Sequence, residues 1–193
     1  MKKAVSFVVA VCLLTAILLT FSSCAFRNPI DSFVKKIEKK ESYQLAMTMS
    51  LSDFTVTQII KCDGNISYTA ANDTLGTPAT YTEIYDDETY EYTKDSAGKW
   101  RKAKKEDTED DLTEELLELL DGDNYEKVKG EKNKYRQKES VVFEKFEDVR
   151  ITIDDDAMVI KCEMTLQGET WDLKLVFSKL GEIDLTLPEV GSK

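Results

Sequence analysis

Apolar and polar residues alternate with a period of two along most of this 193-residue chain, and this pattern constrains the fold more than any other feature. The clearest run begins directly after a short segment whose apolar residues have helical spacing. Its apolar members are Tyr43, Leu45, Met47, Met49 and Leu51. Such alternation is typical of a β-strand with one buried face, and its repetition between turn sequences predicts an antiparallel sheet.

The sequence predicts an α+β chain in which about ten antiparallel strands form one curved sheet and two helices accompany it. The first helix is predicted to start at Pro29 or Asp31 and to run to about residue 40, with Phe33, Val34 and Ile37 forming an apolar stripe. The second is the leucine-rich segment at 112–120. The charged segment 124–138 is predicted to be a loop. The predicted strands are 43–51, 54–62, 66–70, 81–86, 89–93, 99–103, 141–149, 150–153, 157–166 and 169–178, followed by a last apolar alternation at 183–187.

The tripeptide Ile-Lys-Cys occurs twice, and each copy places its cysteine, Cys62 or Cys162, on the apolar face of a predicted strand. A compartment outside the cytoplasm would permit a disulfide between them. In a sheet whose strands follow chain order, however, these two strands are not neighbours. We therefore favour two separate buried thiols, with a Cys62–Cys162 bridge as the alternative.

The first 24 residues have the order of a secretory signal. Lys2 and Lys3 precede an uncharged apolar run at 4–21, and two small residues then lead to Cys24. The sequence Phe-Ser-Ser-Cys that ends this segment resembles a bacterial lipobox, in which the cysteine is acylated and becomes the first mature residue. An uncleaved membrane helix is the alternative, because the apolar run approaches the length needed to span a bilayer.

These features predict a lipoprotein signal peptide at 1–23, an acylated Cys24 with a short tether at 24–30, and a single folded domain at 31–193. The protein is then anchored to the cell membrane through lipid on Cys24, with its bulk on the extracytoplasmic face. More than one acyl chain, such as palmitate, is needed for a firm anchor, because a single chain binds only marginally.

Charge and composition argue against several classes of function. Without residues 1–23, which contain two lysines and no acid, the chain has 24 basic and 37 acidic residues, a net charge of −13. We expect no nucleic-acid partner, because a phosphate backbone needs a basic footprint. The chain has no histidine, which removes the commonest general base and the commonest metal ligand. We expect no enzymatic activity, no metal site and no cofactor.

Four features of the chain occur together: a helix before the first strand, the segment IYDDETYEYTKDSAGKWRK, a leucine-rich helix between two blocks of strands, and the ending LVFSKLGEIDLTLPE. Together, over about 31–189, they resemble the lipoprotein-localisation-factor fold of the LolA/LolB family and of the LppX- and LprG-like lipoproteins. The resemblance implies a half-open barrel whose open side is covered by the two helices. It also implies a cavity for an acyl chain or a similar amphiphile.

The side chains expected to line that cavity are rich in methionine and aromatic rings. Methionine adapts to irregular ligands, although a stripe of methionine and aromatic residues more often fills a core, here packed against the two helices. The expected function is non-covalent binding of a lipid, an acyl chain or another amphiphile. The alternative is an interaction or structural protein of the cell envelope, with a filled core and no small ligand. The candidate lining residues are Met47, Met49, Tyr68, Tyr90, Tyr92, Leu116, Leu120, Met158, Met164 and Trp171.

Overall fold

A computed structural model describes residues 28–72, 78–86, 88–105 and 116–190 of the chain. The predicted signal segment, Cys24 and the first part of the leucine-rich segment, including Leu112, lie outside these ranges. In the ranges that are described, no helix is long and apolar enough to cross a membrane.

The first described helix, α2 (Pro29–Lys40), begins at Pro29, the earlier of the two predicted starts. Asn28 caps it by accepting a hydrogen bond from the Ile30 N–H at 3.0 Å. Pro29 lies in the first turn, where the backbone N–H groups have no acceptor within the helix, so proline costs no hydrogen bond there. Glu41 ends the helix in the left-handed backbone conformation. The apolar stripe expected from helical spacing is buried, and Ile30 extends it at the amino end.

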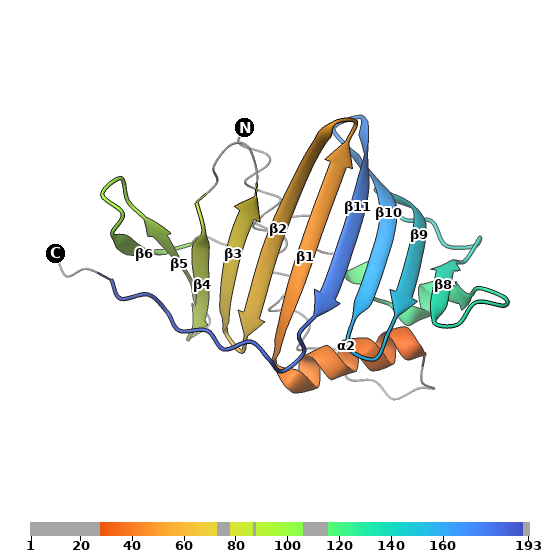
Figure 1. Cartoon of the computed structure of the whole chain (residues 1–193), viewed down its shortest axis with the longest axis horizontal. Coiled ribbons are helices and arrows are strands. Elements are labelled where there is room, and N and C mark those ends of the chain that lie inside the picture. The colour runs from red at the N-terminus through yellow and green to blue at the C-terminus, as the bar shows by residue number, and fades with distance from the viewer. Residues whose placement is uncertain (1–27, 73–77, 87, 106–115, 191–193) are drawn as a thin grey trace.

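Eleven antiparallel strands form one open sheet (Figure 1). Its order is β6-β5-β4-β3-β2-β1-β11-β10-β9-β8-β7, so β1 and β11, the first and last of the described strands, pair with each other in the interior of the sheet. We call β2–β6 the amino half of the sheet and β7–β10 the carboxyl half. The strands are β1 (Ser42–Leu51), β2 (Phe54–Asp63), β3 (Ile66–Asn72), β4 (Thr80–Tyr85), β5 (Glu88–Lys94), β6 (Trp100–Lys104), β7 (Tyr125–Lys127), β8 (Lys134–Gln137), β9 (Phe146–Ile153), β10 (Met158–Leu166) and β11 (Glu169–Ser178).

The antiparallel α+β architecture is confirmed, with three corrections to its details. The segment 124–138 is not a loop, because β7 and β8 lie within it and each buries one tyrosine, Tyr125 or Tyr135. The strands predicted at 141–149 and 150–153 are a single strand, β9, which begins only at the buried Phe146. The segment 183–187 is not a strand, and the Leu185 N–H donates instead to the Asp63 carboxylate at 2.9 Å.

The pairing register fixes which side chains share a face, because directly paired residues project to the same side of a sheet. Leu45 on β1 pairs with Ile60 on β2 and with Phe177 on β11, and all three side chains are buried. We call the face that carries these residues the inner face and the opposite one the outer face. In Figure 1, α2 crosses the end of the sheet where β1 begins, and it contacts β1 and β9.

The apolar core lies between α2, residues 116–120 and the inner face of the sheet. Most of its strand residues come from β1, β11 and the carboxyl half. Among the described residues, the members of this core that belong to the amino half are Ile60 and Cys62, both on β2. The core therefore fills one side of the sheet and stops near β2.

A glycine fixes the start of α2 to the turn η2 (Gly122–Asn124), which leads into the carboxyl half. The Gly122 N–H donates to Asp31 Oδ1 at 2.9 Å, and the Asn28 side-chain amide donates to the Gly122 carbonyl. A Cβ at residue 122 would lie 2.5 Å from Asp31 Oδ1 and 2.6 Å from Asn28 Cγ. Only glycine fits between these two side chains, so this contact holds α2 over the carboxyl half.

Candidate functional site

The ten candidate lining residues do not form one surface. Tyr68 pairs with Lys61, which projects away from its buried neighbours Ile60 and Cys62, so Tyr68 lies on the outer face. The same register places Tyr90 and Tyr92 on the outer face. These three tyrosines therefore cannot share a lining with the residues on the inner side, which are Met47, Met49, Leu116, Leu120, Met158, Met164 and Trp171.

Over the carboxyl half, the inner face is packed rather than open. Met158 and Met164 on β10 are fully buried, and they belong to the same apolar core as Leu116 and Leu120. Side chains from α2 complete that core. These four candidates therefore serve as core residues of the carboxyl half. Met47 and Met49 on β1 are buried members of the same core, at its margin, and a ligand site on the inner face has to lie along that margin at β1 and β2.

Gln58 interrupts the apolar inner face of β2. Its side chain is only 2% exposed, and its Nε2 atom has no hydrogen-bond partner in the part of the chain that the structure describes. Met47 on β1 and Ala71 on β3 lie directly opposite it. A buried donor without an acceptor costs about 1–3 kcal/mol, so an oxygen atom supplied from outside the sheet would stabilise this position.

At the strand ends far from α2, the inner face ends in a partly exposed aromatic rim. Phe54 at the start of β2 is 41% exposed. Its ring meets the half-buried Trp171 ring edge to face, with 6.1 Å between the ring centroids. Between this rim and Gln58 lie Met49 and Val56, which pair with each other. An apolar surface thus runs from the rim to an unpaired polar group.

Beyond Gln58, the buried side chains on the inner face of β3 and β4 carry hydroxyl groups. Ser67 and Thr69 on β3 and Thr82 on β4 are buried on this face. The register pairs Ser67 with Cys62 and with Thr82, which places the apolar-to-polar boundary between β2 and β3. Gln58 stands at that boundary.

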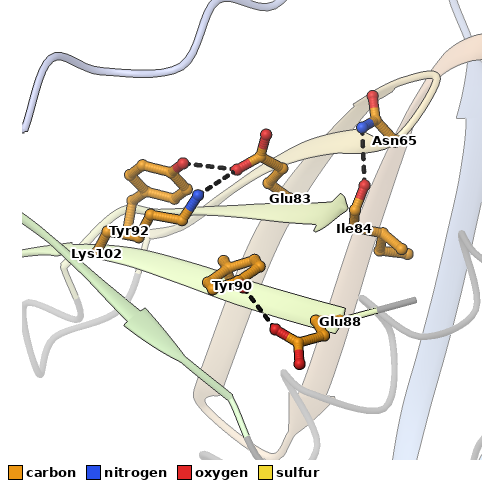
Figure 2. Close-up of polar contacts among 7 residues, drawn as sticks. All are labelled: Asn65, Glu83, Ile84, Glu88, Tyr90, Tyr92 and Lys102. Atoms are coloured by element: carbon orange, nitrogen blue, oxygen red, sulfur yellow. Dashed lines mark hydrogen bonds and ion pairs between the residues drawn. The ribbon is translucent and has the colours of Figure 1, made fainter. Parts of the chain in front are cut away.

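On the outer face, strands β4 to β6 carry a cluster of ionic and aromatic groups (Figure 2). Glu83 accepts hydrogen bonds from the Tyr92 hydroxyl at 2.6 Å and from Lys102 Nζ at 2.9 Å. Lys102 Nζ also lies 4.1 Å from the centroid of the Tyr90 ring, and the Tyr90 hydroxyl donates to Glu88. The lysine, tyrosine and glutamate side chains of this cluster therefore supply one another with hydrogen-bond and charge partners.

These contacts set the charge state of the cluster. The hydrogen bonds from Tyr92 and Lys102 hold the pKa of Glu83 below its ordinary value. Burial and the hydrogen bond to Glu83 raise the pKa of Tyr92, and hydrogen bonding with Tyr92 and Glu83 raises the pKa of Lys102. At neutral pH Glu83 is therefore a carboxylate, Lys102 an ammonium and Tyr92 a neutral phenol. Glu88 is paired in the same way with Lys104, so this part of the outer face presents an aromatic surface with little net charge.

A row of aromatic rings extends this cluster across the outer face. The Tyr68 and Tyr81 ring centroids are 4.9 Å apart, and those of Tyr81 and Trp100 are 5.4 Å apart. The rings of Tyr68, Tyr81 and Trp100 are half-buried, and Lys94 Nζ lies 5.0 Å from the Trp100 ring centroid. Sequence reasoning did not join these residues, because their neighbourhood depends on strand register.

Cys62 and Cys162 both lie on the inner face and are not joined by a disulfide. Cys62 pairs with Tyr43, whereas Cys162 pairs with Leu173, which is level with Met49. Six residues along β1 correspond to about 20 Å, far beyond the reach of a disulfide. Burial raises the pKa of the Cys162 thiol to about 12, so it behaves as a small apolar core residue.

Comparison with known proteins adds no family to this picture. No protein-family model matches the chain, and no curated protein matches it. In the described ranges, no group of three or more cysteine, aspartate or glutamate side chains is placed to hold a metal ion. The candidate site therefore rests on the geometry of the inner face alone.

Proposed function

We propose that this chain is a membrane-anchored extracytoplasmic lipoprotein that binds an amphiphile non-covalently on the inner face of β1, β2 and β11. One observation carries the proposal: the apolar inner face runs from the exposed rim at Phe54 and Trp171 to the unpaired amide of Gln58. An apolar surface that ends in a single polar group is complementary to a molecule with a long apolar body and one polar end.

The proposed arrangement is a half-open barrel in which α2 and the leucine-rich segment lie over the open side of the sheet. The open edges at β6 and β7 and the core packing of α2 and residues 116–120 are compatible with it. Within this arrangement Met47 and Met49 contact the apolar body of the ligand, because methionine side chains adapt to irregular shapes. The resemblance to lipoprotein-localisation factors supports the same ligand class.

The proposed anchor is lipid on Cys24. A signal peptide at 1–23 would export the chain, and the short tether at 24–30 would hold the domain close to the membrane surface. Such a position suits a protein that takes up an amphiphile from the membrane, because the rim at Phe54 and Trp171 then lies only a short distance from the bilayer surface.

A second function, that of an envelope interaction protein without a small ligand, is favoured by the outer face. The half-buried rings of Tyr68, Tyr81 and Trp100 and the paired charges beside them have the aromatic and polar composition of a binding surface. The filled core over the carboxyl half suits this function equally well.

Mass spectrometry of the full chain, extracted from the membranes of its producing host with a nonionic detergent, separates the two functions. We expect the denatured mass to match a chain that begins at an acylated Cys24. We also expect the native mass to exceed it by that of one amphiphile. A native mass equal to the denatured mass, at every detergent dilution, would favour the interaction protein.

A further inference from the structure

Resting on the proposed amphiphile site, we infer that Gln58 holds the polar end of the ligand. Its Nε2 group donates a hydrogen bond to the carbonyl oxygen of an acyl group, either an acyl ester or a fatty acid in its neutral, protonated form. The inference assigns a role to a residue that sequence reasoning left out of the site, although its place in the apolar alternation of β2 is visible in the sequence.

The need for an outside acceptor follows from the burial of this amide. Gln58 is only 2% exposed, so bulk water does not reach its Nε2 freely, and no described residue accepts a bond from it. The positions directly across from it, Met47 and Ala71, carry no strong acceptor in their side chains. The missing partner is therefore a ligand oxygen or a trapped water.

The surroundings of Gln58 decide what kind of ligand carries that oxygen. Its neighbours on the inner face of β2 are Val56 and Ile60, and Met47 lies across from it on β1. A sugar or a small anion would bury many polar groups against these apolar side chains at high cost. An acyl chain buries apolar atoms there and presents one carbonyl oxygen to the single donor.

The distance along the strand fits such a molecule. Gln58 lies four residues from Phe54, which corresponds to about 13 Å along β2. Met49 and Val56 occupy the inner face between them. The apolar chain of the ligand then extends from Gln58 toward the rim at Phe54 and Trp171, and the carbonyl end is the part that is held deep in the site.

Photo-crosslinking in isolated membranes that contain the full-length protein tests this assignment. Three probes carry the same diazirine-bearing sixteen-carbon chain: a free acid, its methyl ester and an alkane without oxygen. Each is applied to the wild type, to Gln58→Met and to Thr82→Val. The last variant is the matched control, because it removes a buried hydroxyl from the same face, two strands away.

We expect light-dependent labelling of β1 and β2 in the wild type. Gln58→Met should lower labelling by the acid and the ester about three- to tenfold at sub-saturating probe. Labelling by the alkane should stay unchanged, and Thr82→Val should match the wild type with every probe. If only the acid loses labelling, the ligand is a fatty acid; if acid and ester lose it equally, an acyl ester fits as well.

Equal labelling of wild type and Gln58→Met by acid and ester would overturn the inference and assign the partner of this amide to a buried water, while the proposed function would stand. Absence of labelling of the wild type by all three probes would overturn the proposed function itself. Urea denaturation of Gln58→Met guards against misfolding. We expect stability at least equal to that of the wild type, because the variant removes an unpaired buried donor.

Discussion

The two halves of the sheet have the same topology and opposite chemistry. From the central pair β1 and β11, each half runs outward as antiparallel neighbours, β2 to β6 on one side and β10 to β7 on the other. The carboxyl half buries apolar side chains against α2, whereas β3 to β6 carry hydroxyls on one face and paired tyrosine, lysine and glutamate on the other. Topology alone therefore does not decide where the core lies.

The position of α2 accounts for the difference. The contacts of Gly122 with Asn28 and Asp31 hold the start of this helix to the turn before β7, so its apolar stripe covers the carboxyl half. The inner face of β1 and β2 lies at the edge of the area that α2 covers. The boundary between a packed half and a polar half is where we place the ligand site.

The largest expected effect contrasts one aromatic ring from each half. Phe146 on β9 is 1% exposed in the apolar core, so Phe146→Ala should lower the free energy of unfolding by about 3–5 kcal/mol. Tyr81→Ala on the outer face removes a half-buried ring with two aromatic neighbours, and we expect a loss of about 1–2 kcal/mol. Urea denaturation measures both. Equal losses of unfolding free energy in the two variants would contradict the proposed difference in packing between the two halves of the sheet.

The second effect concerns the attachment of α2. Gly122→Ala would force a Cβ against Asp31 and Asn28 and break both of their hydrogen bonds, at a cost of about 2 kcal/mol in the free energy of unfolding. The exposed neighbour Asp123 provides the control, because Asp123→Ala should change stability by less than about 0.5 kcal/mol. If both variants were equally stable, the glycine contact would not be what positions α2.

The smallest effect concerns the ionic cluster of the amino half. The pKa of Glu83 is lower in the folded protein than in the unfolded chain. Ionised Glu83 therefore adds to the free energy of unfolding at pH values above the pKa of an unfolded glutamate, near 4.3. This addition is lost as the pH falls through the pKa of Glu83 in the folded protein. The contribution is below about 1 kcal/mol, because the Lys102 side chain is 36% exposed and solvent screens its interaction with Glu83.

Unfolding free energies measured between pH 6 and pH 3 give the comparison. Glu83→Gln should lose less stability over this range than the wild type. Glu126→Gln, which removes an exposed partner of Arg136 in the carboxyl half, is the control and should follow the wild type. A steeper pH dependence for Glu83→Gln than for the wild type would contradict the direction of the pKa shift.

Local alternation predicted most strands, but it did not predict which face each one presents. The two-residue turn at 64–65 pairs Asp63 with Ile66, so Tyr68 follows Lys61 onto the outer face. An apolar Ile-Ser-Tyr alternation indicates only that one face is apolar, not which side of the sheet it joins. Counting the turn residues would have separated Tyr68 from the methionines.

Other features lie outside what local patterns can reveal. The pairing of β1 with β11 joins segments more than a hundred residues apart, and no local signal encodes it. Strands β7 and β8 are too short for alternation to be recognised, with one buried tyrosine each. Gln58 is the opposite case, because a polar residue within an apolar alternation is plain in the sequence and only its burial shows that it lacks a partner.

Hydrogen exchange of the full-length protein, with and without added palmitate, tests most directly whether an amphiphile occupies the inner face at this boundary. We expect palmitate to slow exchange in β1 and β2 and at the rim around Phe54, and to leave residues 116–120, β8 and β9 unchanged, because the carboxyl half is already packed. Unchanged exchange in β1, in β2 and at the rim, or slowing confined to β4–β6, would contradict the inner-face site.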